Sequence, residues 1–539
     1  MKHKLILLYL CVAAVLAGCY EDKGNYSYTD IPKYVIDESS FGGGSTLSLA
    51  QGDTLTLSPV ILSEQGDTLR DIANVEYSWS IDYAQVVSRE RDLTYVCDSL
   101  MSNALLVFDI HDLVNDLHYA QTVYVSVREK YSGAGFYILG EKDGHTCLSA
   151  ILSSSFLGDK VDIANSTIRT VVGVYHAEND EYLPDDPIRL HEHNWYGGGP
   201  QVMVITPTEL VDVESSTFVK DMTGSEMIDG GWPAGMRAAN VMYMGWTDVL
   251  EDEEGQIYTR IKSTKELPNS EYFYPVPCKC EGEDEPLTDT HIIVSKLGGN
   301  FCLLHDDKHK RLLHVSDIKS DSKGEYTLGR ISALRHFEGP AGFVPLDNYE
   351  GYNLVHCGYH DQYQYGGTGY SYVFIFEKDG QYTVQTCRIW QDNYNSSTLM
   401  VDNMAVLSAS EDGSHVNLID DIMRADSYVY TLPYTTQASN PGAYTFIASG
   451  NDLYMLDRTA KSVKKYLSFD APVTAMCGEW FNSNYMGLGL ANGKFYLLPM
   501  QNAKNLDDSA KILWESPDDF GRIVSVRTKE ANGWGVDQF

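Results

Sequence analysis

The sequence predicts an all-β protein in which a small β-sandwich precedes a β-propeller. Three observations support this fold class: alternating polar and apolar residues in the first quarter of the chain, a hairpin pattern that recurs afterwards, and no sustained helical period. With 43% hydrophobic and 21% charged residues, the composition is that of a globular chain. Because 539 residues are too many for one core, we expect two or three domains.

A short apolar segment stands at the N-terminus. Lys2 and Lys4 precede an apolar run that ends at Leu16-Ala17-Gly18-Cys19, and this run is too short for a permanent transmembrane helix. We therefore interpret residues 1–18 as a signal peptide. Small residues before a cysteine resemble a bacterial lipobox, which implies that Cys19 carries lipid and tethers the mature chain. The alternative is an ordinary signal peptide with an accidental cysteine.

Residues 19–30 are expected to form the lipidated tether. Glu21 and Asp22 lie directly behind Cys19, in a pattern that resembles the surface-export signal of Bacteroidota lipoproteins. This resemblance implies a protein that is anchored in the outer membrane and faces the cell exterior.

Residues 31–129 have the pattern of a β-sandwich. Short alternating runs such as Thr54–Leu57 and Val75–Ile81 are separated by Gly, Asp and Ser turns, and Gln121–Arg128 is a period-2 strand that closes the segment. Together with the lipobox, this tract resembles the PKD-like family lipoproteins of Bacteroidota. The Trp-x-Phe-Gly-Asp-Gly signature of true PKD domains is missing, because Ser80-Ile81-Asp82-Tyr83 follows Trp79.

Residues 130–539 repeat an apolar strand, a Gly-containing turn and a second apolar strand. Turns such as Lys142-Asp143-Gly144, Lys378-Asp379-Gly380 and Asn492-Gly493 supply the positive φ of tight hairpins. Hairpins that recur over roughly 400 residues without crossover helices predict a β-propeller of about seven or eight blades. We expect Arg522–Arg527 to be its closing strand. The alternative is two or three further sandwiches in series.

The formal net charge of −35 restricts the partners. Such a surface repels nucleic acid and anionic lipid, so we expect neither as a partner and expect membrane contact through the lipid anchor only. Solubility alone is a sufficient reason for this acidity.

Catalytic and metal-binding signatures are weak. No Gly-x-Ser-x-Gly window occurs, and His191-Glu192-His193 lacks the second histidine of a zinc-protease motif because Trp195 occupies that position. His191 and His193 would still share one face of a strand, and His356 and His360 pose the same question. We expect no catalytic residue, no metal and no cofactor.

Acidic runs and cysteines give no stronger signal. The runs 251–254 and 281–285 lack the alternating spacing of a calcium loop, so solvated loops are expected there. Eight cysteines remain beyond Cys11 and Cys19, several of them within apolar runs, and they predict buried thiols rather than a disulfide framework. Cys278-Lys279-Cys280 has neither thioredoxin-type nor zinc-type spacing.

Two aromatic, glycine-rich tracts are candidates for binding. Residues 193–200 and 359–370 combine aromatic rings with amide side chains and glycines, and 230–233 is a weaker third tract. The alternative is that these rings pack locally in blade connections. The candidate binding residues are Trp195, Tyr196, Trp232, Tyr363, Tyr365 and Tyr370.

These observations predict a non-enzymatic surface lipoprotein with a sandwich as spacer and a propeller as binding head. The family resemblance implies an accessory role beside a SusC-type outer-membrane transporter and a SusD-type lipoprotein, in which the head captures peptide or glycan for uptake. One alternative is a surface hydrolase or lyase with a carboxylate or metal site at the propeller axis. Another is a purely architectural lipoprotein that holds other surface lipoproteins in place.

Overall fold

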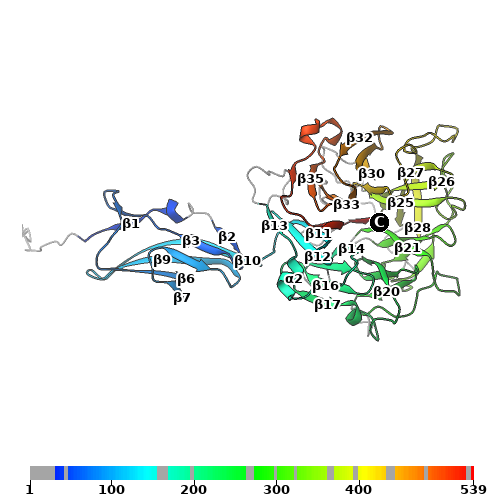
Figure 1. Cartoon of the computed structure of the whole chain (residues 1–539). Helices are drawn as coiled ribbons and strands as arrows, with labels where there is room; N and C mark the ends of the chain where they lie inside the picture. The colour runs from blue at the N-terminus through cyan, green and yellow to red at the C-terminus, as the bar shows by residue number, and fades with distance from the viewer. Residues whose placement is uncertain are drawn as a thin grey trace, which may run out of the picture. The chain divides into compact units, whose positions relative to one another are not determined.

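The chain divides into two compact units, Met1–Lys130 and Tyr131–Phe539. In this computed structural model the described residues are 31–41, 46–153, 168–194, 200–262, 272–296, 300–320, 324–360, 369–391, 398–432, 443–478, 484–529 and 536–538. In Figure 1 the strands of unit 1 are blue and those of unit 2 run from cyan to red.

Unit 1 consists of one five-stranded sheet and two smaller sheets. The five-stranded sheet has the order β2-β10-β9-β6-β7, and the smaller ones are β1-β4-β5 and β3-β8. The strands are β1 Tyr34–Ile36, β2 Leu47–Ala50, β3 Thr54–Leu57, β4 Ile61–Ser63, β5 Thr68–Leu69, β6 Val75–Ile81, β7 Gln85–Ser88, β8 Leu93–Val96, β9 Met101–Asp112 and β10 Leu117–Arg128.

Trp79 occupies the centre of the unit 1 core. Its side chain is fully buried, its ring lies 4.7 Å from the Phe108 ring and 5.4 Å from the Phe41 ring, and its indole N–H donates to the Glu90 carbonyl at 3.1 Å. Residues of the smaller sheets, such as Leu55 and Ile61, belong to the same core. Residues of both layers thus share one core, which is the arrangement of a β-sandwich.

Unit 2 begins with an antiparallel sheet whose fourth strand comes from the other end of the chain. This sheet has the order β13-β12-β11-β37, and the next two are β14-β15-β16-β17 and β18-β19-β20. Their strands are β11 Gly135–Lys142, β12 His145–Leu152, β13 Arg169–Val171, β37 Arg522–Lys529, β14 Arg189–Asn194, β15 Pro200–Ile205, β16 Leu210–Glu214, β17 Lys220–Thr223, β18 Ala238–Tyr243, β19 Thr247–Asp252 and β20 Ile257–Ile261.

Four more sheets complete the described part of unit 2. Their orders are β24-β23-β22-β21-β38, β25-β26-β27-β28, β29-β30-β31-β32 and β33-β34-β35-β36. Their strands are β21 Thr290–Lys296, β22 Phe301–Asp306, β23 Arg311–Ser316, β24 Ile331–Ala333, β25 Asn353–His360, β26 Gly369–Lys378, β27 Gln381–Gln391, β28 Leu399–Val406, β29 Tyr428–Thr431, β30 Tyr444–Ser449, β31 Asp452–Asp457, β32 Ser462–Ser468, β33 Val473–Gly478, β34 Tyr485–Leu490, β35 Phe495–Pro499, β36 Trp514–Glu515 and β38 Val536–Gln538.

The sheets of unit 2 follow one another around a ring, as Figure 1 shows. One strand of each sheet contacts the equivalent strand of the next sheet, in the cyclic order β37, β14, β18, β21, β25, β29, β33 and back to β37. This is the arrangement of a β-propeller. The expected propeller is therefore confirmed, and the described residues form seven of its sheets.

The C-terminal strand β37 closes the ring. It pairs antiparallel with β11, so that Val526 lies opposite Ile138. Ile523 and Val526 are fully buried. The expectation of a closing strand at Arg522–Arg527 is confirmed, and the strand continues to Lys529.

Tight turns join many of the strand pairs at positions that the sequence indicated. In the β11–β12 turn, Asp143 and Gly144 have φ values of 53° and 81°, and Asp379 and Gly380 in the β26–β27 turn have 52° and 81°. Two successive positive φ values are those of a two-residue hairpin turn. Among the described helices, none is both long and apolar enough to cross a membrane.

Strand β38 continues beyond the closing strand. Its backbone pairs with β21, the first strand of a different sheet, with Val536 opposite Lys296. Because β21 has β22 on its other side, β38 lies on the axial side of that sheet. The chain therefore adds a strand at the propeller axis.

Candidate functional site

A pocket of about 320 Å³ lies beside the first sheet of unit 2. It is formed by the β11–β12 turn, the start of β12 and the helix α2 (Val174–Asn179) with the residues that follow it. We call it the α2 pocket. The side chains used below are those of Lys142, His145, Cys147, Tyr175, His176 and Tyr182.

Three rings form a stack in this pocket. The Tyr182 ring lies 4.0 Å from the His145 ring at an interplanar angle of 16°, and 4.1 Å from the His176 ring at 7°. Two imidazoles this close to one tyrosine ring cannot fit side by side on the same face, so they cover opposite faces. Tyr182 is nevertheless 53% exposed.

Backbone contacts place Tyr182 between the two imidazoles. Thr146 forms an isolated bridge with Leu183, and its hydroxyl donates to the Pro184 carbonyl at 2.6 Å. The helix α2 lies between Gly173 and Asp180, both of which are in the left-handed region. His176 is oriented by a 3.1 Å contact between its Nδ1 and the Glu181 carbonyl, so Nδ1 carries the proton.

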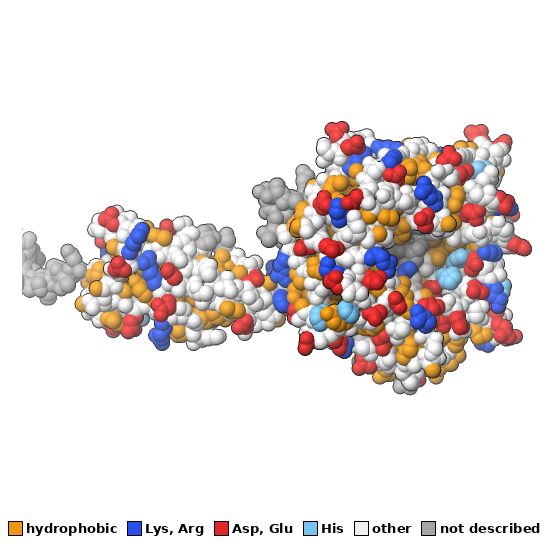
Figure 2. Space-filling model, viewed as in Figure 1, with side chains coloured by type: hydrophobic (Ala, Val, Ile, Leu, Met, Phe, Trp, Pro, Cys, Tyr) orange, Lys and Arg blue, Asp and Glu red, His pale blue; other side chains and the backbone are white. Residues whose placement is uncertain are grey.

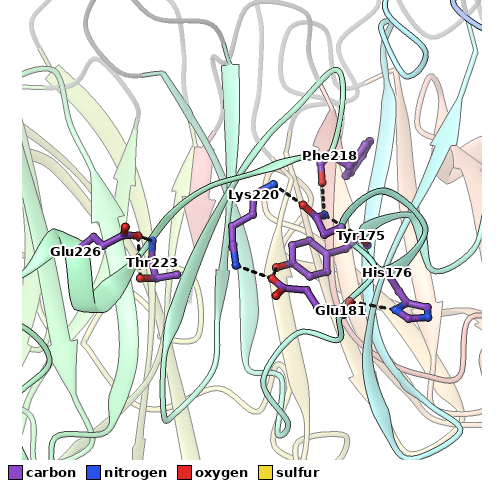
Figure 3. A network of polar contacts seen from close by, with 8 residues as sticks. Tyr175, His176, Glu181, Phe218, Lys220, Thr223 and Glu226 are labelled. Atoms are coloured by element: carbon purple, nitrogen blue, oxygen red, sulfur yellow. Dashed lines mark hydrogen bonds and ion pairs between the residues drawn. The ribbon is translucent and has the colours of Figure 1, made fainter.

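A polar network fixes α2 to the neighbouring sheet, as Figure 3 shows. Lys220 donates through Nζ to Glu181 Oε1 at 2.7 Å, and the Tyr175 hydroxyl donates to the same oxygen at 2.5 Å. The Asn179 side-chain amide donates to the Tyr175 and Phe218 carbonyls, both at 2.8 Å. Lys220 and Tyr175 lower the pKa of Glu181, while burial and Glu181 raise the pKa of Tyr175. The wall of the pocket is thus held in place by hydrogen bonds.

The α2 pocket combines aromatic surface with polar groups. Its volume lies at the lower end of the range of small-molecule sites. The imidazole nitrogens can exchange hydrogen bonds with a ligand, and Lys142, which also pairs with Asp519, is a further donor. The pocket is therefore suited to holding one small polar ring or side chain.

Most sequence-predicted site residues lie outside the described part of the chain. These are Cys19, Glu21, Asp22, Trp195, Tyr196, Tyr363 and Tyr365. Tyr370 lies on β26 opposite Ile389, and its side chain is also outside the described part.

Trp232 is described, and it packs locally. Its indole N–H donates to the Met236 carbonyl at 3.0 Å, and its ring packs against a buried cluster that includes Tyr243. A Cβ on Gly224 would lie 2.4 Å from the ring, so the short helix α3 (Gly224–Met227) depends on glycine there. This geometry corresponds to the local-packing alternative.

His191 and His193 share one face of β14, as expected, and both are buried. His193 Nε2 lies 2.8 Å from Asp212 Oδ1, and its ring stacks on Tyr243 at 3.8 Å. His191 Nε2 lies 3.3 Å from Asn240 Oδ1. Asn240 and Tyr243 both lie on β18, so the two histidines hold β14 against the next sheet.

His356 is likewise a buried residue, and its Nε2 contacts the Thr431 hydroxyl at 2.9 Å. Burial lowers the pKa of His356 to about 3. It is therefore neutral at ordinary pH.

The first acidic run is not a solvated loop throughout, which corrects the expectation. Glu251 and Asp252 are buried at the end of β19. Glu251 accepts from the Ile292 backbone N–H at 2.8 Å and contacts His291 Nδ1 at 2.8 Å, and it raises the pKa of His291. Tertiary hydrogen bonds make burial of this carboxylate tolerable.

The second acidic run is mostly exposed, as expected, and two of its acids form ion pairs. Glu283 pairs with Arg311 at 2.6 Å, and Glu281 lies 3.6 Å from Arg330. Figure 2 shows acidic and basic side chains interspersed on the visible face of unit 2.

The expected absence of a disulfide framework is confirmed for the cysteines of the described residues. All are free, and most are buried. Cys147 and Cys278 are partly exposed.

The sequence reasoning missed the residues of the α2 pocket. His145 begins β12, His176 lies on α2 and Tyr182 follows that helix, so no spacing rule links them. The Asp143-Gly144 turn was recognised, and it places His145 at the start of β12.

The solved structures to which this chain is similar are distant. A quinonprotein alcohol dehydrogenase-like protein from Bacteroides thetaiotaomicron has 12% identity, with 92% of this chain and 99% of that chain covered and a TM-score of 0.38. AztD from Citrobacter koseri has 10% identity, coverage of 85% and 99%, and a TM-score of 0.35. BamB from Moraxella catarrhalis has 10% identity, coverage of 74% and 96%, and a TM-score of 0.31. At these scores the similarities assign no function to the chain.

No curated protein sequence matches this chain. The model of the PKD-like family matches residues 19–187, which confirms the PKD-like resemblance and extends it past unit 1 through the first three strands of unit 2 and α2.

Proposed function

We propose that this protein is a non-enzymatic, lipid-anchored surface protein that captures peptide or glycan for a SusC/SusD-type uptake complex. The observation that carries the binding part of the proposal is the α2 pocket, in which Tyr182 stands between His145 and His176. The lipobox-like sequence at Cys19 and the PKD-like match support the surface setting.

The groups around the pocket favour binding over catalysis. Glu181, two residues beyond the end of α2, is engaged by Lys220 and Tyr175, and this pairing lowers its pKa. A general acid at neutral pH requires a raised carboxyl pKa. Glu181 is therefore suited to holding the wall of the pocket rather than to transferring protons.

A tethered head of this kind needs only modest affinity. Anchoring at Cys19 would hold the pocket close to a co-tethered transporter, and the local concentration of captured ligand would rise without tight binding at one site. The chain would act as a receptor that hands ligand over.

Cys147 gives a direct test of pocket occupancy. This free thiol lines the pocket and is partly exposed, so a thiol reagent should label it in the native protein. Panels of short peptides and oligosaccharides are added before labelling, and the modified cysteine is identified by mass spectrometry. A ligand of the pocket will slow labelling of Cys147 but not of Cys278, which is partly exposed elsewhere in unit 2. Unchanged Cys147 labelling with every peptide and oligosaccharide would reject the pocket as the capture site.

The uptake setting has a separate test. The full chain is extracted from its native membrane in mild detergent, and co-purifying proteins are identified by mass spectrometry. SusC-type and SusD-type proteins in stoichiometric amounts are expected, together with loss of membrane association in Cys19→Ser. Recovery of the chain alone would contradict the uptake role and leave the pocket result unaffected.

A further inference from the structure

A cluster of two histidines and two aspartates lies at one end of the five-stranded sheet of unit 1. His111 on β9 is directly opposite His118 on β10. Residues opposite each other in antiparallel strands point to the same face of the sheet. The two imidazole rings are stacked, with centroids 4.2 Å apart and planes 5° apart.

The hairpin turn beside these histidines is pinned by hydrogen bonds. Asp112 Oδ1 accepts from the backbone N–H groups of Val114 at 2.9 Å and Asn115 at 3.3 Å, and Asp112 Oδ2 accepts from the Asn115 amide at 2.7 Å. Asp116 follows in the left-handed region with φ 54°. The turn thus returns the Asp116 carboxylate over β9, where its Oδ1 lies 2.9 Å from His111 Nε2.

Three ligand atoms converge at this place. One atom each from His111, Asp116 and His118 lie within 4.8 Å of one another. A tetrahedral zinc ion with bonds of about 2.0–2.1 Å needs ligand atoms about 3.3 Å apart and binds each imidazole in its ring plane, so the two stacked rings must turn away from each other about their side-chain bonds to hold one ion. Two imidazoles and a carboxylate, with water in the fourth position, form a known type of zinc ligand set.

Asp109 supplies the outer contact that metal-binding histidines usually have. Its Oδ2 lies 2.8 Å from His118 Nδ1, which leaves His118 Nε2 as the remaining ring nitrogen. A carboxylate in this position fixes the ring and makes the other nitrogen a better ligand. His118 and Asp116 are both largely exposed, so an ion can reach them from solvent.

We propose that His111, His118 and Asp116 form a binding site for a divalent transition-metal ion, with Asp109 as the positioning residue. Zn²⁺ is the ion to test, because Ca²⁺ and Mg²⁺ prefer sites made of oxygen atoms. The ion joins β9 to β10 across the turn, and its open position accepts water or a donor atom from another molecule.

The test uses the full chain after treatment with a chelator, and it measures Zn²⁺ and Ca²⁺ binding by calorimetry. We expect Zn²⁺ to bind at this site and Ca²⁺ to bind at least tenfold more weakly. His118→Ala and Asp116→Ala should abolish this binding, and Asp109→Asn should weaken it about 10–100-fold. His336→Ala is the matched control, because His336 is also an exposed histidine paired with an aspartate, Asp347, but lies in unit 2.

Thermal unfolding gives a second readout. Zn²⁺ that binds only the folded state should raise the melting temperature of unit 1 in the wild type and in His336→Ala, but not in His118→Ala. Circular dichroism checks that each variant is folded. The proposal would be overturned if His118→Ala and Asp116→Ala bound zinc with the same stoichiometry and affinity as the wild type. It would also be overturned if the wild type bound no Zn²⁺. In either case the cluster would be a set of histidine–aspartate pairs only.

Discussion

Arg522 donates through Nη2 to Glu141 Oε2 at 2.8 Å, although 381 residues separate them in the chain. The contact joins the last strand of the first propeller sheet, β37, to β11, the first strand of unit 2 in sequence. An exposed pair of this kind contributes little free energy by itself. The pair marks the junction of β37 and β11, at which the ring closes. Buried side chains of β37, such as Ile523 and Val526, pack at the same junction.

Deleting the closing strand should open the ring. A chain that ends at Gly521 lacks β37, leaves the edge of β11 without its partner and loses two fully buried side chains, each of which contributes about 1.5–3 kcal/mol. We expect loss of cooperative unfolding of unit 2 and rapid proteolysis between 131 and 521. The control ends at Lys529, which removes β38 but keeps β37, and its melting temperature should stay close to that of the full chain. Equal stability of the two truncated chains would contradict the closure by β37.

Trp79→Ala should destabilise unit 1 alone. The indole is fully buried among Phe41 and Phe108, and loss of such a ring costs about 3–5 kcal/mol. In calorimetry the unit 1 transition should shift down while that of unit 2 stays. Tyr124→Ala is the control, since Tyr124 is 55% exposed on β10 of the same sheet and its removal should change stability by less than about 0.5 kcal/mol. A shift of both transitions would show that the units do not unfold independently.

The three-ring stack should depend on the ring of Tyr182 and not on its hydroxyl. Tyr182→Ala removes two aromatic contacts, each worth about 0.5–1.5 kcal/mol, whereas Tyr182→Phe keeps both. In NMR spectra, the imidazole protons of His145 and His176 should move downfield in Tyr182→Ala, because the tyrosine ring current is lost. If these protons also moved in Tyr182→Phe, the hydroxyl would be responsible and the stack would not hold the pocket.

The contribution of two buried histidines to the stability of unit 2 should fall as the pH falls below 6.5, and buried Asp317 acts with the opposite sign because burial raises its pKa to about 7. Burial lowers the pKa of His356 to about 3 and that of His305 to about 4, so in this range these two histidines bind more protons in the unfolded state than in the folded state. At pH 5 the unfolded form gains about 2 kcal/mol from His356. Urea unfolding of unit 2 between pH 7 and pH 5 measures this loss, and His356→Gln should reduce it.

His336 provides a control of opposite sign. Its contact with Asp347 raises its pKa, so it favours the folded state at low pH, and this contribution is lost as the pH rises through the folded pKa. His336→Gln should therefore leave the acid-side loss intact or make it slightly larger. A pH profile that His356→Gln does not flatten would show that His356 is not the group responsible.

The sequence determined the local structure of this protein. Alternating residues from Val75 to Ile81 form β6 with the expected bounds, and the Asp143-Gly144 and Asp379-Gly380 pairs adopt the positive φ values that hairpin turns require. These features depend on side-chain alternation and backbone sterics within a few residues, which a single sequence contains.

Only the tertiary structure determined which residues meet at the candidate sites and which carboxylates are buried. Glu251 looked like part of a solvated loop, yet it is buried because His291 and the Ile292 backbone, 40 and 41 residues later, satisfy its oxygens. Tyr182 reaches His145 and His176 only through the bridge between Leu183 and Thr146, and His111 meets His118 only in the β9–β10 register. Such contacts depend on which strands pair and on how the ring closes, so residues far apart in the chain become neighbours for reasons that no local pattern contains.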